Sequence, residues 1–143
     1  MQGVDMSRPQ IPSPAQLVVS VLSSRLIQIW PEVERELRSG WGELDFVSDP
    51  FPFTQTRYYD QELGTPIMRR LISFQHLVAQ DRLPEIKLAT NALEDVWRDK
   101  KGYRQVNLDP GLLCLERLVL GTGKNFTHRI YLGQGIFADL TLI

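Results

Sequence analysis

The stretch Leu17-Val18-Val19-Ser20-Val21-Leu22 is a compact apolar run that is rich in β-branched residues. Its length and its β-branched content favour a strand that is buried on both faces. A strand of this kind belongs in the middle of a sheet, so the first element of the domain is predicted to lie at the centre. Residues 1–15 precede it, and their three prolines among polar residues predict a flexible N-terminal tail.

An amphipathic helix is predicted directly after this strand. Apolar residues recur there at helical spacing, with charged residues between them: Leu26, Trp30, Val33 and Leu37. Gly40 and Gly42 are expected to end the helix. Because proline lacks the N–H group and clashes with the preceding turn, Pro31 is expected either in the first turn or at a kink.

Three more strands and a second long helix are predicted in the middle of the chain. The strands cover residues 44–47, 69–74 and 103–108. Residues 48–53 contain two prolines and are expected to form a sheet edge or an extended loop, and 54–66 are expected to form a loop. Asp81 is expected to cap the second helix, which runs to about Arg98.

The last third of the chain contains one ambiguous segment and one clear hairpin. Asp109-Pro110-Gly111 suits either the start of a helix, with Asp109 as its cap, or a tight turn. Residues 112–120 are too uniformly apolar for periodicity to decide between helix and strand, and we favour a short buried helix. Residues 128–132 and 136–143 alternate as two strands, and Gly133-Gln134-Gly135 joins them as a hairpin.

The order strand, helix, strand, strand, helix, strand matches the split βαβ, or ferredoxin-like, arrangement. Right-handed crossovers would place both long helices on one face of the sheet. The predicted fold class is therefore α+β, with a ferredoxin-like sheet and a C-terminal β-hairpin. Residues 16–143 are long enough for one hydrophobic core and are expected to form a single domain.

Composition excludes several classes of protein. The chain has 16 basic and 17 acidic residues, a formal net charge of −1, so nucleic-acid binding driven by bulk charge is not expected. Its single cysteine excludes an internal disulfide and a cysteine-based zinc site. No stretch is long and apolar enough to span a bilayer, and the N-terminus lacks the apolar centre of a signal peptide. A cytoplasmic protein without a membrane partner is therefore expected.

Five segments in register resemble one family. They are DFVSDPFPF at 45–53 with Tyr58-Tyr59 after it, RLISF at 70–74, IKLATNALE at 86–94, RQVNLDPG at 104–111 and HRIYLGQGI at 128–136. Together they resemble the bacterial and archaeal "domain of unknown function 4416" family, from about Leu17 to Ile143. The resemblance implies no settled function. It also implies a further strand and an aromatic-rich tail, so a chain that stops at Ile143 is expected to be shortened.

The second helix carries a polar stripe that suggests a binding site. Its members recur at i, i+3, i+4 and i+7: Lys87, Thr90, Asn91 and Glu94. A solvated helix face is the simpler interpretation, yet Thr and Asn are unfavourable inside helices. Polar residues in or beside predicted strands would meet this stripe in a cleft of mixed charge that suits a small anionic ligand. These residues are Arg70, Asn107, Asp109, His128 and Arg129.

Other groups of residues fit known site chemistries poorly. Gly121-Thr122-Gly123-Lys124 lacks both the earlier glycine of a phosphate-binding loop and the Ser or Thr after its lysine, so we interpret it as a turn. His76 and His128 have no metal-ligand spacing. Asp45, Asp49 and Asp109 are interpreted as surface carboxylates rather than as an oxygen-rich site. Neither a metal site nor a cofactor is predicted.

Two hypotheses for function follow. The first is a binding module that recognises a small anionic ligand or a protein partner, including a second copy of the chain in a homodimer. The second is an enzyme that uses His128 with Asp109 or Glu94 for acid–base chemistry on a small anionic substrate. The aromatic residues Phe51, Phe53, Tyr58 and Tyr59 are expected to complete the core, or to mark a ligand surface if they are exposed together. Because no catalytic signature stands out, we favour the binding module.

Overall fold

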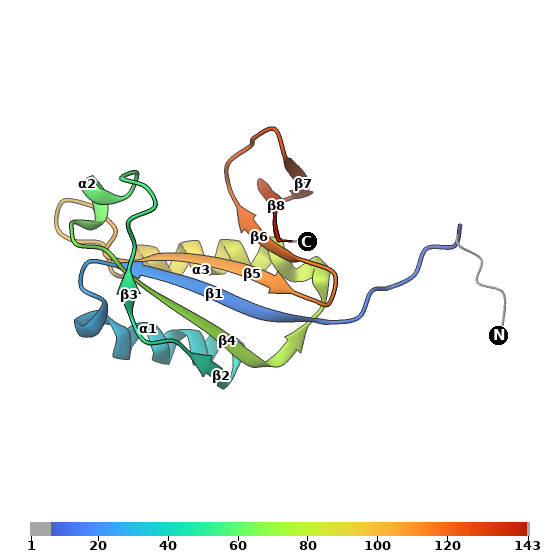
Figure 1. Ribbon diagram of the computed structural model, residues 1–143, viewed down its shortest axis with the longest axis horizontal. Coiled ribbons are helices and arrows are strands. Elements are labelled where there is room, and N and C mark those ends of the chain that lie inside the picture. Colours follow the sequence, from blue (N-terminus) through green and yellow to red (C-terminus); the bar gives the residue numbers. More distant parts are fainter. Residues whose placement is uncertain (1–6, 143) are drawn as a thin grey trace.

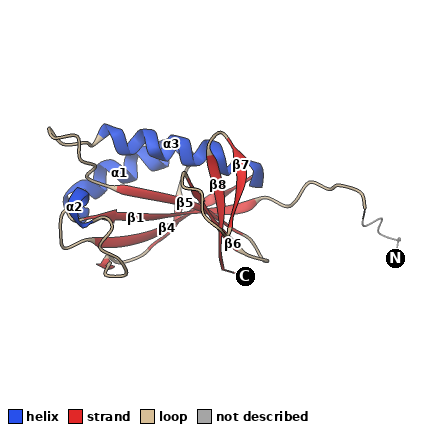
Figure 2. Ribbon diagram, turned by 90° about the horizontal axis from the view of Figure 1, so that it is seen from above, coloured by secondary structure: helices blue, strands red, loops and turns tan. Residues whose placement is uncertain are grey.

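The structure is a computed structural model that describes residues 7–142. Within this range the chain forms an eight-stranded antiparallel sheet with three α-helices, which confirms the predicted α+β class. Helices α1 (Leu26–Trp41) and α3 (Leu83–Val96) cover the same face of the sheet (Figures 1 and 2). Helix α2 (Asp60–Leu63) is a single turn at one end of the sheet, inside the segment that was predicted to be a loop.

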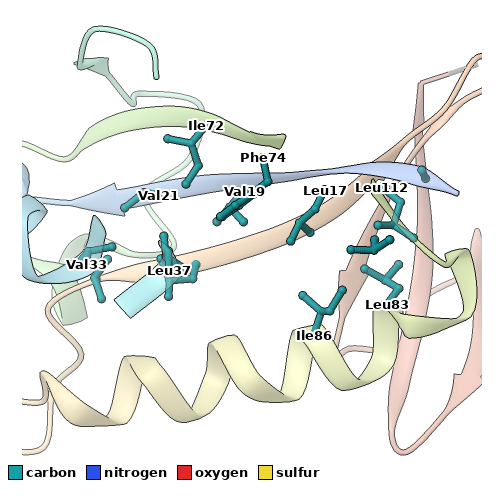
Figure 3. Packing of buried hydrophobic residues seen from close by; sticks show 14 of the residues in the cluster. Leu17, Val19, Val21, Val33, Leu37, Ile72, Phe74, Leu83, Ile86 and Leu112 are labelled. Carbon is teal, nitrogen blue, oxygen red and sulfur yellow. The ribbon is translucent and has the colours of Figure 1, made fainter. Parts of the chain in front are cut away.

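Strand β1 (Ala15–Ser23) lies at the centre, as predicted, and pairs with β4 (Met68–Val78) on one side and β5 (Asn107–Leu113) on the other. Leu17, Val19 and Val21 are almost completely buried and point toward the helices (Figure 3). The alternate residues of β1 from Gln16 to Ser20 are only half-buried. The prediction that β1 is buried on both faces is therefore wrong for the face without helices.

The remaining strands extend the sheet on both sides of this centre. The order across the sheet is β2 (Leu44–Val47), β4, β1, β5, β6 (Leu118–Thr122), β8 (Ile136–Leu142) and β7 (Arg129–Gly133). The two-residue strand β3 (Phe51–Pro52) also pairs with β4, which fits the edge predicted there. Strands β6, β7 and β8 form an arm that rises away from the plane of the long strands (Figure 1).

Two hydrophobic clusters stabilise the molecule, one on each side of the sheet. The larger cluster packs Val33 and Leu37 of α1 and Ile86 of α3 against β1 and its neighbours (Figure 3). The smaller cluster contains Leu22, Leu63 and Ile67, with Phe53 and Tyr59 packed against it. Leu22 follows Val21 in an extended strand and therefore points to the opposite face, beneath the loop that carries α2.

The segment around Asp109-Pro110-Gly111 is neither a turn nor a helix start, because it lies inside β5. The short helix favoured for residues 112–120 is also wrong, because β5 and β6 run through this range. Proline is tolerated in β5 because β6 pairs only with residues from Gly111 onward. The Leu108 N–H points to the open edge, so the nitrogen of Pro110, two residues later, faces the same side and needs no strand partner.

The ends of the predicted helices and of the fourth strand require correction. Asp81 lies in a short 3-10 helix and does not cap α3, which begins at Leu83 with Pro84 in its first turn. Pro31 lies in α1 beyond its first turn. Residues 103–106 do not form a strand, and the backbone N–H of Arg104 donates to Glu62 Oε2 over 3.2 Å instead of to a neighbouring strand.

The hairpin of β7 and β8 is confirmed. Gly133, the last residue of β7, and the turn residues Gln134 and Gly135 have φ values of 109°, 56° and 80°. At the other end of the chain, residues 7–14 are exposed and form no helix or strand, whereas Ala15 is buried in β1. Residues 1–6 of the predicted tail lie outside the described range. No helix in the described part is long and apolar enough to cross a membrane.

Candidate functional site

The candidate site lies where β5 has an open edge. Strand β6 pairs with Gly111, Leu112 and Leu113 only, so the earlier part of β5 lacks a neighbour on that side. The Leu108 N–H donates to Glu94 Oε2 over 2.6 Å, and the Leu108 carbonyl accepts from Lys87 Nζ over 3.2 Å. Buried backbone groups need partners, and here side chains of α3 supply them in place of a strand.

Arg104 connects the groups at this edge. Its guanidinium donates to both oxygens of Glu62, from Nη2 over 2.7 Å and from Nε over 2.9 Å. Its Nη1 donates to Asn107 Oδ1 over 2.8 Å and to Glu94 Oε1 over 3.3 Å. Hydrogen bonding by Arg104 lowers the pKa of Glu62, and Glu62 in turn raises the pKa of Arg104. Burial raises the pKa of Glu94, against the opposing effect of its bond to Leu108.

Asp109 is the carboxylate at the centre of the site. It accepts from Asn107 Nδ2 over 2.9 Å and from Lys87 Nζ over 3.4 Å. Asn107 therefore links Arg104 to Asp109, with its oxygen toward the guanidinium and its amide nitrogen toward the carboxylate. Burial, followed by the charge of Asp109, raises the pKa of Tyr59, so this phenol stays protonated and able to donate.

Several of these groups line a cavity of about 380 Å³. Five residues of the predicted site line it: Lys87, Asn91, Asn107, Asp109 and Arg129. The structure thus brings together one part of the α3 stripe with polar residues from β5 and β7. Six further residues complete the lining: Tyr58, Tyr59, Arg104, Thr122, Gly123 and Lys124.

The other four predicted residues do not line this cavity. Thr90 and Glu94 are buried behind it, and Thr90 Oγ1 donates to the Lys87 carbonyl over 2.9 Å. Arg70 lies elsewhere, with its guanidinium 4.8 Å from the ring centroid of Trp30 in α1. His128 is exposed, one residue before β7, and is not part of the lining.

Six of the residues that line the cavity are not among the site residues predicted from the sequence. Tyr58 and Tyr59 are predicted to complete the core, or to mark a ligand surface if they are exposed together with the two phenylalanines, and Thr122-Gly123-Lys124 is interpreted as part of a turn. Arg104 gives a usable signal, because it lies at two-residue spacing from the buried residues Val106 and Leu108 and would share their face in an extended chain. A charge in an inward-facing position needs a compensating partner, which here is Glu62.

The cations of the cavity differ in how far they are compensated. Lys87 pairs with Asp109, Arg104 pairs with Glu62 and Glu94, and Arg129 pairs with Asp139 over 3.2 Å. Lys124 has no carboxylate within ion-pair distance in residues 7–142. Its ammonium lies 3.8 Å from the ring centroid of Tyr58 and donates to the Tyr58 hydroxyl. Lys124 is therefore the cation whose charge is least neutralised.

The predicted aromatic group is divided between core and surface. Phe53 and Tyr59 are packed against the smaller hydrophobic cluster, with 6.1 Å between their ring centroids. Phe51 and Tyr58 are exposed, and the two tyrosines border the cavity whereas the two phenylalanines do not. Residues 7–142 contain no group of three or more His, Cys, Asp or Glu side chains able to hold a metal ion.

Comparison with known proteins gives one match. The family model described as "Domain of unknown function (DUF4416)" matches residues 13–143, which is most of the chain. No curated protein and no solved structure matches the chain.

Proposed function

The chain belongs to the DUF4416 family, for which no function is established, and we propose that it binds a small anionic ligand in the cavity beside β5. The observation that carries this proposal is the lining of that cavity, which contains four cationic side chains and a single carboxylate. Concave sites with a few convergent polar groups are the usual places for small-molecule binding.

The charge pattern limits the ligand to one or two negative charges. Three of the four cations already have carboxylate partners, and only Lys124 lacks one within the described range. A polyphosphate would need more uncompensated positive charge than this, whereas a carboxylate or a phosphate monoester would match it. Tyr58 and Tyr59, whose rings are nearly perpendicular at 89°, offer aromatic surface for the rest of the ligand, and the amide of Asn91 offers one donor and one acceptor group.

We also propose that the four strands β2, β4, β1 and β5 with helices α1 and α3 form a split βαβ unit of the ferredoxin-like kind. The strand order β2-β4-β1-β5 and the position of both helices on one face support this proposal. In this view, strands β6, β7 and β8 are an addition to the β5 edge. The cavity then lies at the junction between the unit and its addition, where β5 is left unpaired.

The alternative, an enzyme that uses His128 with Asp109 or Glu94, has less support. His128 does not line the cavity. Both oxygens of Glu94 are already bonded, one to the Leu108 N–H and the other to Arg104. A proton-transfer group needs to come within hydrogen-bond reach of its substrate, and these two residues do not share such a position.

A thermal-shift screen tests the binding proposal. The purified protein is heated with inorganic phosphate, phosphorylated metabolites, small carboxylates, nucleotides and divalent metals in turn. A ligand that binds the folded state raises the melting temperature by mass action. We expect a response to at least one phosphate monoester or carboxylate and a weaker response to nucleoside triphosphates.

Lys124→Gln is the diagnostic variant, and Lys101→Gln is its matched control. Lys101 is an exposed lysine in the connection between α3 and β5, outside the cavity lining. Loss of a charge-assisted bond is expected to weaken binding about tenfold in Lys124→Gln, with no change in the control. A screen without any response, or equal binding by both variants, would contradict the proposal and would favour a protein partner instead.

A further inference from the structure

The face of the sheet that lacks helices contains a second cavity, larger and more apolar than the first. Its volume is about 610 Å³, within the range of small-ligand sites. The floor is formed by side chains that alternate with the buried core residues, and the arm of β6 and β8 forms one wall. Apolar side chains dominate this groove: Val18, Leu71, Leu113, Leu118 and Leu120.

One guanidinium lies at this groove without a partner. Arg69 lines it, and no hydrogen bond or ion pair reaches its side chain from the residues that the structure describes. Its Nε is buried, and its guanidinium carbon lies 4.7 Å from the ring centroid of Phe53. Burial of this kind costs free energy unless an acceptor is present, so the position favours an incoming anion.

A second unpartnered donor lies on the neighbouring strand. Ser20 Oγ is buried and has no hydrogen-bond partner within the described residues. Ser20 in β1 is opposite Leu71 in β4, and Arg69 is two residues from Leu71 on the same face. The hydroxyl and the guanidinium are therefore diagonal neighbours, and both belong to the lining of the same groove.

We propose that this groove binds a single-chain amphiphile with a carboxylate head, of the medium-chain fatty-acid class. The Arg69 guanidinium and the Ser20 hydroxyl, which have no hydrogen-bond partners within the described residues, turn toward the groove and donate to the carboxylate. The hydrocarbon tail covers Val18, Leu71 and Leu120, which removes apolar surface from water on both sides of the contact. This site is separate in chemistry from the polar cavity and goes beyond the function proposed for it.

The head group is a carboxylate rather than a phosphate because Asp109 also lines the groove. Burial lowers the pKa of Arg69, and the negative charge of Asp109 opposes that shift, so Asp109 already neutralises part of the positive charge of the guanidinium. A dianionic phosphate would be repelled by Asp109 more strongly than a monoanionic carboxylate. The apolar floor, for its part, favours a hydrocarbon tail over a sugar or a peptide.

Isothermal titration with decanoate tests the proposal, with decanol as the probe that keeps the tail and lacks the charge. Arg69→Met keeps a long apolar stem over Phe53 and removes the guanidinium. Arg70→Met is the matched control, because Arg70 also has a buried, unpartnered Nε but packs on Trp30 and does not line the groove. Melting curves of both variants establish that they are folded.

We expect decanoate to bind the unaltered protein more tightly than decanol does. Arg69→Met should weaken decanoate binding about tenfold and leave decanol binding unchanged, while Arg70→Met should change neither. Leu71→Asn, at an exposed position, should weaken both probes. Absence of decanoate binding, or equal losses in the two arginine variants, would overturn the proposal. A concentration-dependent dimer that Leu71→Asn dissociates would also overturn it, because a second copy would then occupy the groove.

Discussion

At the scale of single residues, some members of the α3 stripe bond buried backbone groups, while another member borders the cavity. Glu94 and Lys87 satisfy the backbone of Leu108, and the hydroxyl of Thr90 bonds back to the carbonyl of Lys87. Asn91, at the same helical face, borders the cavity. The open edge of β5 is thus satisfied by Glu94 and Lys87, whereas Thr90, which is unfavourable inside a helix, bonds within α3 itself.

Glu62→Gln is expected to make stability less dependent on pH. The folded-state pKa of Glu62 is lowered, mainly by its hydrogen bond to Arg104, so the folded protein prefers the ionised carboxylate. Its stabilising contribution is present above the ordinary carboxyl pKa and is lost as the pH falls through the lowered folded-state value. At neutral pH the variant should be less stable by about 1 kcal/mol, because solvent screens this partly exposed pair.

Urea unfolding of both proteins at a series of pH values from about 7 to 3 measures this effect. The free energies of unfolding should converge toward the acid end of the series. Glu43→Gln is a suitable control, because Glu43 forms a more exposed ion pair with Arg38. A difference between Glu62→Gln and the unaltered protein that stays constant with pH would show that the Glu62 charge is not responsible.

At the scale of elements, the sequence was most informative where a single hydrophobic pattern or a single turn motif dominated the segment. Three patterns each have one physical interpretation, and all three elements are confirmed. They are the apolar run of β1, the helical spacing of the apolar residues in α1, and the glycine turn between β7 and β8. The segment 110–120 has no such period, and Asp109-Pro110-Gly111 carries strong turn chemistry. The segment nevertheless forms the end of β5 and the start of β6, because pairing with β1 stabilises β5, pairing with β5 and β8 stabilises β6, and the open edge tolerates Pro110.

The candidate site was only partly predictable for the same reason. Helical spacing placed Lys87 and Asn91 on one face, and that inference needs only the periodicity of α3. The meeting of α3 with Tyr58 and Lys124 depends on tertiary packing, because these two residues are far apart in the chain and lie on different loops. No local pattern encodes their contact across the cavity.

Two glycine substitutions, one in the β5–β6 pair and one in α1, are predicted to have opposite effects on stability. An added Cβ at Gly111 would lie 2.6 Å from Leu120 Cδ2 and 2.9 Å from the Val119 carbonyl oxygen. The Leu120 side chain can move, whereas the Val119 carbonyl oxygen is held in the backbone of the paired strand β6. Gly111→Ala should therefore destabilise the fold by about 1–3 kcal/mol. Gly40 lies inside α1, and a Cβ added there would meet no atom within 4 Å, so Gly40→Ala should stabilise by about 0.5–1 kcal/mol.

Urea denaturation of the two variants beside the unaltered protein measures both effects. The two substitutions add the same methyl group, so the comparison separates steric crowding from the general effect of replacing glycine. Equal stability of Gly111→Ala and the unaltered protein would mean that β5 and β6 are less closely paired than the structure indicates.

At the scale of the whole molecule, the two faces of the sheet are unequal. Both long helices cover one face (Figures 1 and 2). The other face carries the apolar groove, the smaller cluster and the loop with α2. The two cavities share Asp109, which belongs to both linings. One carboxylate on β5 therefore lies between a polar site at the strand edge and an apolar site on the sheet face.

This asymmetry predicts two levels of local stability, which hydrogen exchange can measure. Strand β1 pairs on both sides and lies against the larger cluster, so its amides should exchange only through global unfolding. Strand β7 pairs with β8 alone, and Ile130 and Tyr131 are 70% and 59% exposed. Its amides should exchange through local opening of the arm, on the order of a hundredfold faster or more. Equal protection of β7 and β1 would contradict the prediction, and protection of β7 that rises with protein concentration would instead indicate that a second copy pairs with this edge.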